Sequence, residues 1–448
     1  MESPLSNHRL ETQFKDSKPL YSESEARIEA NRCLYCYDAP CIKACPTGID
    51  IPGFIRKIAS GNIRGSAQTI FQSNILGSST ARVCPVEELC AGACVYNDLD
   101  HHPIQIGRLQ RFATQRALEL EKNSQRPLFI PLPKINKKVA LIGAGPASLA
   151  CGAYLALEGV EAVIFEKSQI PGGLNVSGIA PYKFMAQDGM NEIHWLQQFG
   201  ITIHTGVNIG KDVKVKDLLT EYHAVFLGIG LGHDSFPKIP GEELENVWGA
   251  TNLIRRIKND PDFDLPKNLK KVIVVGGGNT AIDIARELAI LGVPEVDIVY
   301  RRTEDVMPGY HHELVLAKAN GVRLVEKQTP VKILKKEDGT LEFFTKHTDT
   351  KSPMIHQTDW IVMAIGQSKI ARDLVPRLAV DEKGRVSVDD DTGETSIPGL
   401  YAGGDCINGG KEVVNASADG RDAAHAMLKS WGMTPVFTNP KFRSNGNG

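Results

Sequence analysis

Apolar residues follow a helical spacing in the first quarter of the chain and a strand-and-turn spacing in the rest. Residues 51–61 and 104–120 place apolar side chains at intervals typical of an amphipathic helix. Residues 22–31 begin with serines that can cap a helix. From residue 138 onward, short β-branched runs end in glycine turns that open helices. The pattern predicts an α-helical domain followed by α/β domains.

Two segments after a proline-rich linker at residues 126–138 share one design. Residues 137–159 and 270–292 each run from a β-branched strand through a glycine turn into a helix. This order is typical of the βαβ unit that holds a dinucleotide with its pyrophosphate at the helix N-terminus. Two such units in one chain predict two bound nucleotides.

The first unit carries the expected nucleotide contacts. Gly143 and Gly145 allow the backbone to approach a pyrophosphate, and Ser148 stands where glycine or alanine is usual. Glu166 ends the next strand, about 20 residues beyond the glycines, where an acid accepts both ribose hydroxyls. The alternative role for Glu166 is that of a solvated strand end.

The second unit differs at the end of its second strand. Its expected phosphate contacts are Gly277, Gly278, Asn279 and Thr280. Arg301 and Arg302 stand where an acid would favour NADH, so the sequence favours NADPH through a contact to its 2′-phosphate. Glu304 and Asp305 lie close by in the sequence and leave NADH as the alternative.

Composition and charge narrow the class of protein. At 448 residues the chain has room for about three domains. Its formal net charge of −2 gives no reason to expect nucleic acid or an anionic membrane as a partner. The most apolar stretch, residues 139–157, contains glycines and Pro146, so we expect strand, turn and helix and no membrane span. The first ten residues lack an apolar secretory core, which favours the cytoplasm.

Seven of the nine cysteines fall between Cys33 and Cys94, in a spacing that indicates metal coordination. The first four follow C-x2-C-x4-C-x3-C-P, and the last three follow C-P-x4-C-x3-C. Crowded thiolates of this kind hold iron–sulfur clusters, whereas structural zinc, the main alternative, usually takes two separated pairs. A disulfide framework fits poorly, because a chain of this length can bury a core without one. Two four-iron clusters would leave one ligand position without a cysteine.

The nucleotide motifs resemble those of flavoproteins that bind two dinucleotides. The matching parts are G-x-G-P-A in the first unit, E-K after it, and G-G-D ending at Asp405. The resemblance implies FAD in the first site, Asp405 at the ribityl-phosphate portion of the flavin, and residues 364–366 beside the nicotinamide. It adds these cofactor-binding positions: Pro146, Ala147, Lys167, Gly172, Gly173, Leu174, Ala364, Ile365, Gly366 and Gly404.

Around the cysteines the likeness is more specific. The segments CLYCYDAPCIKACPTGIDIPGFI, ARVCPVEELCAGACV and IGRLQRFA resemble the N-terminal half of dihydropyrimidine dehydrogenases and the separate NAD(P)- and FAD-binding subunit of the bacterial enzymes. The likeness spans about residues 25–428, and the small subunit of glutamate synthase is a wider relative. It implies one [4Fe–4S] cluster on Cys33, Cys36, Cys41 and Cys94, and another on Cys45, Cys84, Cys90 and Gln110.

Two of these assignments depend on the resemblance. Without it, Gln110 would be interpreted as an exposed polar residue of a helix. Lys183 is included because it matches a position near the flavin in the family.

The expected fold class is α+β multidomain, with an N-terminal α-helical iron–sulfur domain followed by two nested Rossmann-like α/β nucleotide-binding domains. The expected parts are residues 1–123 with two [4Fe–4S] clusters, residues 138–255 and 368–432 for FAD, residues 256–367 for NAD(P), and a tail at residues 433–448.

The resemblance implies an enzyme that supplies electrons to a partner. NAD(P)H would reduce FAD, and two clusters would pass electrons to an FMN-containing catalytic subunit with its own ferredoxin clusters, which reduces uracil and thymine to their 5,6-dihydro forms. We therefore expect a hetero-oligomer, and we name no catalytic side chain. The alternatives are a glutamate synthase small subunit-like or NAD(P)H:ferredoxin-type oxidoreductase, and a non-enzymatic scaffold. Cys151 and Cys406 form no C-x-x-C pair, which argues against a disulfide reductase.

Overall fold

The structure is a computed structural model that describes residues 5–437. Its internal contacts divide the chain into two compact units, each made of several segments. The larger unit comprises residues 17–175, 187–231 and 369–437, and the smaller unit comprises residues 5–16, 176–186 and 232–368. Most of the predicted tail lies outside the described residues.

The larger unit begins with the predicted α-helical domain. Its helices are α1 (Glu23–Asn31), α2 (Pro40–Lys43), α3 (Ile51–Ala59), α4 (Ile63–Ser73), α5 (Gly77–Val83), η2 (Val95–Leu99) and α6 (Ile106–Ser124). Ser22 and Glu25 form a capping box at the start of α1, and the Asp50 side chain caps α3. The apolar faces of α3 and α6 meet in a core that includes Phe54 and Phe112.

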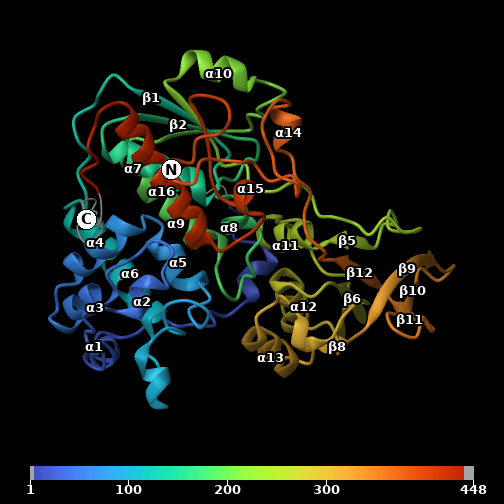
Figure 1. Cartoon of the computed structure of the whole chain (residues 1–448). Coiled ribbons are helices and arrows are strands. Elements are labelled where there is room, and N and C mark those ends of the chain that lie inside the picture. Colours follow the sequence, from blue (N-terminus) through green and yellow to red (C-terminus); the bar gives the residue numbers. More distant parts are fainter. Residues whose placement is uncertain (1–4, 438–448) are drawn as a thin grey trace. The chain divides into compact units, whose positions relative to one another are not determined.

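A five-stranded parallel sheet follows in the larger unit. Its order is β13 (Leu400–Ala402), β4 (Ala224–Leu227), β1 (Lys138–Ile142), β2 (Glu161–Glu166) and β3 (Thr202–Thr205). Helices α7 (Pro146–Leu157) and α16 (Val413–Ser430) lie side by side (Figure 1). Their close approach requires Gly420, because a Cβ there would lie 2.1 Å from the Ala147 carbonyl oxygen. The other helices along this part of the chain are α8 (Gly173–Ser177), α9 (Ala186–Gln197), α10 (Val215–Glu221), α14 (Ala371–Leu374) and α15 (Asp405–Asn408).

The smaller unit holds a second parallel sheet and an antiparallel sheet. The parallel order is β5 (Val247–Gly249), β12 (Trp360–Met363), β6 (Lys271–Val275), β7 (Glu295–Val299) and β8 (Arg323–Val325). The antiparallel order is β11 (Pro353–Thr358), β10 (Leu341–His347) and β9 (Gln328–Lys335). Its helices are η1 (Leu10–Gln13), α11 (Ala250–Asn259), α12 (Asn279–Ile290), η3 (Glu304–Val306) and α13 (His311–Ala319). Because β5 pairs with β12, contacts group residues 232–255 with this sheet, whereas the sequence assigned them to the FAD domain.

Residues 5–16 form an arm that packs within the smaller unit. Leu10 and Phe14 are buried in the same core as α11 and α12. Glu11 is buried and forms an ion pair of 2.8 Å with Arg9, and the amine of the buried Lys258 lies 3.7 Å from the Glu11 carboxylate. The arm is therefore fixed by both apolar contacts and buried charges.

The fold class predicted from the sequence is confirmed. A helical domain precedes a parallel sheet whose strand β13 returns only after the second sheet is complete, so the nucleotide-binding folds are nested in the sequence. None of the helices among residues 5–437 is both long and apolar enough to cross a membrane.

Candidate functional site

The structure brings four of the predicted cluster ligands together, and we call Cys33, Cys36, Cys41 and Cys94 the first quartet. Burial raises the pKa of Cys33, and the neighbouring Cys36 and Cys94 raise it further. Burial also raises the pKa of Cys41 to about 12, with added contributions from Cys33, Cys94 and Cys36. Cys33, Cys41 and Cys94 also pack against one apolar core, although Cys94 is distant in the sequence.

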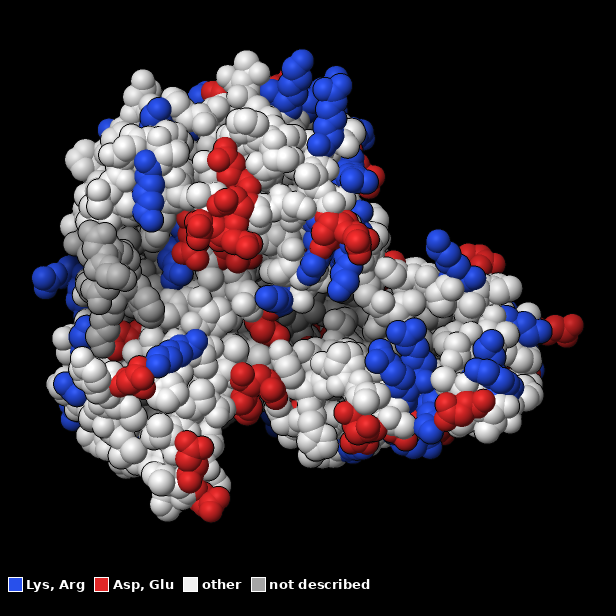
Figure 2. All heavy atoms as spheres, viewed as in Figure 1, with Lys and Arg blue, Asp and Glu red and all other residues white. Residues whose placement is uncertain are grey.

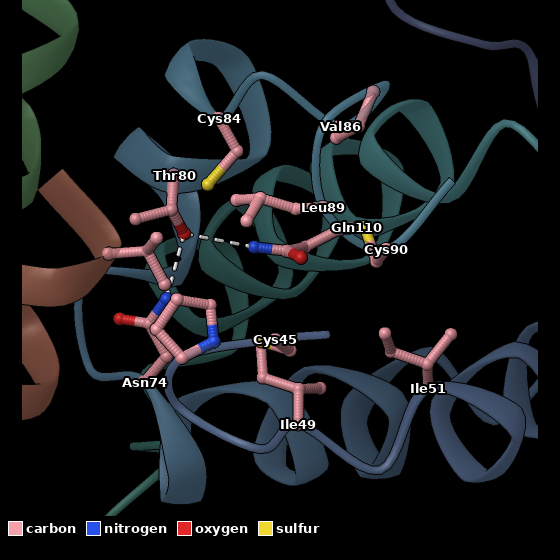
Figure 3. A pocket seen from close by; sticks show the side chains of 12 residues that line it. Cys45, Ile49, Ile51, Asn74, Thr80, Cys84, Val86, Leu89, Cys90 and Gln110 are labelled. Carbon is pink, nitrogen blue, oxygen red and sulfur yellow. Dashed lines mark hydrogen bonds between the residues drawn. The ribbon is translucent and has the colours of Figure 1, made fainter. Parts of the chain in front are cut away.

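The remaining predicted ligands form a second group, Cys45, Cys84, Cys90 and Gln110, which we call the second quartet. All four line one pocket (Figure 3). Burial raises the pKa of Cys84 well above its ordinary value, and Cys90 and Cys45 add to the effect. Burial raises the pKa of Cys90 as well, followed by the effects of Cys45 and Cys41. Cys45 and Cys90 pack against the same apolar core as Cys33, Cys41 and Cys94, so the two quartets lie next to each other.

Gln110 has a fixed orientation in this pocket. The residue is only 7% exposed, so it is not the exposed polar residue that the helical pattern alone would suggest. Its Nε2 donates hydrogen bonds to the Gly77 carbonyl oxygen at 2.8 Å and to Thr80 Oγ1 at 3.1 Å. A carbonyl only accepts, so the nitrogen must face Gly77. The amide oxygen is thereby left among the pocket cysteines, as Figure 3 shows.

The thiols of the two quartets are the ligand type that iron–sulfur clusters take. All the cysteines are free thiols, with no disulfide among the residues described. Within residues 5–437, no three His, Cys, Asp or Glu side chains converge closely enough to hold one metal ion. Zinc would need sulfurs about 2.3 Å from a single centre, whereas a four-iron cluster is a larger body that takes ligands at its corners. Buried thiols with raised pKa values would be converted to thiolates on binding such a group.

The predicted FAD contacts gather at the carboxyl ends of β1 and β2. Gly143 has a φ of +86°, and a Cβ there would lie 2.7 Å from the Gly228 carbonyl oxygen. The buried Glu166 carboxylate accepts hydrogen bonds from the N–H groups of Ala144 and Ser168, both at 2.7 Å. Gly145 precedes α7 as its N-cap. The glycine turn, the helix N-terminus and the acid therefore adjoin, as a dinucleotide site requires.

The glycine–aspartate turn joins the same end of the sheet. A Cβ on Gly404 would lie 3.1 Å from the Ala147 Cβ, so this turn touches the first turn of α7. Asp405 begins α15, and its carboxylate accepts a hydrogen bond from the Lys411 N–H at 3.2 Å. Burial raises the pKa of Asp405. Of the other predicted contacts here, Pro146 begins α7, Gly172 and Gly173 both have positive φ, Leu174 lies in α8, and Lys167 is exposed.

The second glycine turn leaves free space at the N-terminus of α12. A Cβ on Gly276 would lie 2.2 Å from the Ala364 carbonyl oxygen, which places residues 364–366 against this turn. Nothing lies within 4 Å of a Cβ built on Gly278, which is the N-cap of α12. Asn279 accepts a hydrogen bond from the Tyr310 N–H at 2.8 Å. The remaining predicted contacts, Gly277, Thr280, Ile365 and Gly366, belong to the same two turns and the start of α12.

Charged residues follow the end of β7, the strand next to this second turn. Arg301 and Arg302 are exposed beyond the end of β7, where the 2′ position of an adenosine ribose is expected. Glu304 forms an ion pair of 2.6 Å with Lys318. Glu304 is therefore engaged by a lysine, whereas Asp305, the other carboxylate that could serve NADH, is exposed.

Lys183 lies among acidic side chains of the smaller unit. Its amine lies 2.7 Å from the Asp283 carboxylate in α12 and 2.9 Å from the Glu313 carboxylate in α13. Burial lowers the pKa of Lys183, but the two carboxylates outweigh this effect and raise it overall. The role beside the flavin stays a prediction; the observed contacts hold α12 and α13 together.

Sequence reasoning did not find the residues that orient Gln110. Thr80 accepts its hydrogen bond, and Asn74 donates another to the same hydroxyl at 2.9 Å. Neither residue belongs to a spacing motif, because the contact depends on how α5 packs against α6. Only the three-dimensional structure reveals them.

Two family models match the chain in succession. Residues 10–122 match the model described as dihydropyrimidine dehydrogenase domain II, 4Fe-4S cluster. Residues 137–420 match the model described as pyridine nucleotide-disulphide oxidoreductase.

Curated proteins match over nearly the full chain. The NAD-dependent dihydropyrimidine dehydrogenase subunit PreT of Escherichia coli (strain K12) is 34% identical over 410 residues, covering 91% of this chain and 95% of that protein. The glutamate synthase [NADPH] small chain of the same strain is 31% identical over 456 residues, covering 95% of each.

Solved structures share the nucleotide-binding fold. The thioredoxin reductase of Lactococcus lactis matches with a TM-score of 0.54 and 22% identity, over 66% of this chain and 98% of that one. At this identity the likeness concerns the fold alone.

Proposed function

Because this chain belongs to the oxidoreductase family that includes the dihydropyrimidine dehydrogenase subunit PreT and the glutamate synthase small chain, we propose that it is an electron-input subunit of an NAD(P)H-dependent dihydropyrimidine dehydrogenase. Its electrons would leave for a partner subunit that contains FMN and ferredoxin clusters and reduces uracil or thymine. Bound FAD would supply the conversion between the hydride of NAD(P)H and the single electrons that iron–sulfur clusters carry.

The observation that carries this proposal is that the eight predicted ligands lie in one domain, where Cys45, Cys84, Cys90 and Gln110 line one pocket. Seven are thiols, and the eighth is an amide whose nitrogen is held by Gly77 and Thr80. Val414, at the start of α16, also lines the pocket of the second quartet. The nucleotide-binding part of the larger unit therefore touches the second quartet directly, which suits electron transfer from flavin to cluster.

In this role the chain's own residues would bind and orient the cofactors, and no side chain is proposed as a general acid or base. Gly143, Gly145 and the N-terminus of α7 would bind a pyrophosphate, and Glu166 would accept the ribose hydroxyls. Asp405 would adjoin the flavin side of the same site. In the smaller unit, the open N-terminus of α12 above Gly278 would take the second pyrophosphate.

The choice of nicotinamide cofactor follows from the charges beyond β7. Exposed Arg301 and Arg302 suit a 2′-phosphate, while Glu304 is paired with Lys318. We therefore propose NADPH as the better donor, with NADH as the alternative.

A second candidate function is supported by the match to the glutamate synthase small chain. That protein is 31% identical and covered over 95% of its length. The same cofactor arrangement would then pass electrons to a different partner subunit. An NAD(P)H:ferredoxin-type role would differ only in the acceptor. A scaffold role is disfavoured, because seven buried or half-buried free thiols in two groups have no evident structural purpose.

Anaerobic purification tests the cofactor set. We expect about eight irons and one FAD per chain, and Gln110→Ala should remove the electron paramagnetic resonance signal of one cluster. Cys45→Ser should lower the iron content, whereas Cys406→Ser, a matched control outside both quartets, should not. About four irons in the unaltered protein would contradict the second cluster.

The substrate is tested by adding the partner. The chain is expressed with an FMN-containing dihydropyrimidine dehydrogenase subunit, and NAD(P)H-dependent reduction of uracil is followed. Conversion of glutamine and 2-oxoglutarate with a glutamate synthase large subunit, with no uracil reduction, would favour the second candidate.

A further inference from the structure

Three large side chains are exposed on the segments of the iron–sulfur domain that carry cysteines of the first quartet, and we propose that they form a face that binds the protein that accepts electrons from the chain. The inference rests on the proposed function. Leu34, Tyr37 and Leu99 are 53%, 107% and 56% exposed. Leu34 and Tyr37 each directly follow a first-quartet cysteine, and Leu99 ends the short helix η2 that begins after Cys94. We call these residues, with Asp98 and Asp100, the acceptor face.

The segment that presents Leu99 is rigidly held. The Tyr96 hydroxyl donates a hydrogen bond to the Arg32 carbonyl oxygen at 2.7 Å, and the Arg32 guanidinium carbon lies 5.4 Å from the centre of the Tyr96 ring. The Asn97 amide donates to the carbonyl oxygens of Ala91 and Gly92 at 2.9 and 2.8 Å. A surface fixed before binding loses little conformational freedom when a partner docks.

Tyr37 differs from the other tyrosines of this domain that flank cysteines. The Tyr35 hydroxyl donates to the Ala30 carbonyl oxygen at 3.2 Å, and the Arg56 guanidinium carbon lies 4.7 Å from its ring centre. Tyr96 is anchored as described above. Tyr37 makes neither a hydrogen bond nor a ring contact with any described residue, although its ring is fully exposed. Tyrosine is enriched at the centres of protein interfaces, where its ring is buried by the partner.

The charge of the acceptor face indicates the chemistry of the partner. Asp98 and Asp100 are exposed, and neither forms an ion pair with another described residue. Asp38, beside Tyr37, is neutralised by Lys43 at 2.8 Å. In Figure 2 the end of the segment around residue 100, cyan in Figure 1, shows acidic and no basic side chains. A partner with basic residues around its redox centre would be steered to this face.

The order in which electrons would pass the two quartets explains why a partner would dock at the acceptor face. The second quartet adjoins α16 through Val414, and Cys45 and Cys90 of the second quartet pack against the same apolar core as Cys41 and Cys94 of the first. Electrons that enter from the nucleotide-binding side therefore reach the first quartet last. A partner on the acceptor face would contact residues that directly follow Cys33 and Cys36 of the first quartet.

Cytochrome c, a basic protein with a single redox centre, provides the probe. The full chain with its cofactors, purified anaerobically, is given NADPH and either cytochrome c or menadione, a small neutral acceptor for the flavin. Two double variants are compared with the unaltered chain, Tyr37→Ala with Leu99→Ala, and Asp98→Lys with Asp100→Lys. Asp390→Lys with Asp391→Lys, at exposed positions elsewhere, is the control of equal charge change.

We expect each acceptor-face variant to lower kcat/KM for cytochrome c about ten-fold, with menadione reduction and iron content unchanged. The control variant should retain cytochrome c reduction. Unchanged cytochrome c reduction in both acceptor-face variants would overturn the proposal, and so would an unaltered chain that reduces menadione but not cytochrome c. Loss of menadione reduction in the unaltered chain would instead contradict the proposed function.

Discussion

Gln110 Nε2 donates a hydrogen bond of 3.1 Å to Thr80 Oγ1, and this contact fixes the side of the Gln110 amide that faces the thiols. Thr80 donates its own proton to the Leu76 carbonyl oxygen at 3.1 Å. The hydroxyl oxygen is therefore free to accept hydrogen bonds from both Gln110 and Asn74. One buried hydroxyl thus orients two amides at the wall of the second quartet.

Replacing the Thr80 hydroxyl while keeping the volume of the side chain tests whether this hydroxyl positions Gln110. Thr80→Val keeps the shape but removes the acceptor, so we expect the free energy of unfolding to fall by about 1–3 kcal/mol. The electron paramagnetic resonance signal of one cluster, and its midpoint potential, should change because the Gln110 amide is released. Thr80→Ser restores the hydroxyl and should restore both. Identical spectra for all three proteins would contradict the positioning role.

A buried carboxyl group predicts how stability depends on pH. Glu192 in α9 accepts hydrogen bonds from the N–H groups of Ser78 and Ser79 at 3.0 and 3.1 Å. Burial nevertheless raises its pKa to about 7. Because the folded chain keeps this proton to a higher pH than the unfolded chain, stability should fall as the pH rises from about 4.5 to about 7. The loss should approach 3 kcal/mol.

Thermal unfolding across this pH range checks the assignment. Glu192→Gln has no proton to lose and should flatten the pH dependence between about pH 5 and pH 7. Glu161→Gln, at an exposed position, serves as the control and should leave the dependence intact. A decline of the same size in Glu192→Gln would show that other groups cause it.

The contacts of Lys183 predict a structural effect of its removal. Lys183→Met would leave Asp283 and Glu313 without their shared cation, and we expect the smaller unit to lose about 3–5 kcal/mol of stability. Lys183→Arg should keep most of it. The flavin absorbance spectrum should stay unchanged in both variants; a spectral shift in Lys183→Met would instead support the predicted position beside the flavin.

Cofactor preference depends on the two arginines beyond β7. Arg301→Ala with Arg302→Ala should raise KM for NADPH about ten-fold in menadione reduction, because the contacts to the 2′-phosphate are lost. KM for NADH should hardly change. If the ratio of the two KM values stays the same, these arginines do not read the 2′ position. Arg372→Ala, an exposed arginine in α14, is the matched control.

The sequence predicted the parts of the fold that depend on short-range spacing. The two strand–turn–helix units, the glycines with positive φ or close contacts, and the acid at the end of β2 lie where the patterns placed them. The resemblance to a known family supplied the division of the cysteines into quartets. The comparisons confirmed that the chain belongs to an oxidoreductase family with a 4Fe–4S domain. The number of clusters stays a prediction.

The remaining features arise from packing between distant segments. No spacing connects Thr80 with Gln110, or Lys183 with Asp283 and Glu313, because each pair meets only when separate helices pack. The pairing of β5 with β12 is equally non-local, so the sequence pattern left β5 with the preceding domain.

The docking of the arm at residues 5–16 also constrains how the chain is made. Leu10 and Phe14 bury themselves against residues of α11 and α12, and Glu11 needs Lys258 nearby. The arm is therefore synthesised before its binding surface, and we expect it to stay undocked until residues 17–290 have been synthesised. The earliest described segment of this chain is thus among the last to reach its native position.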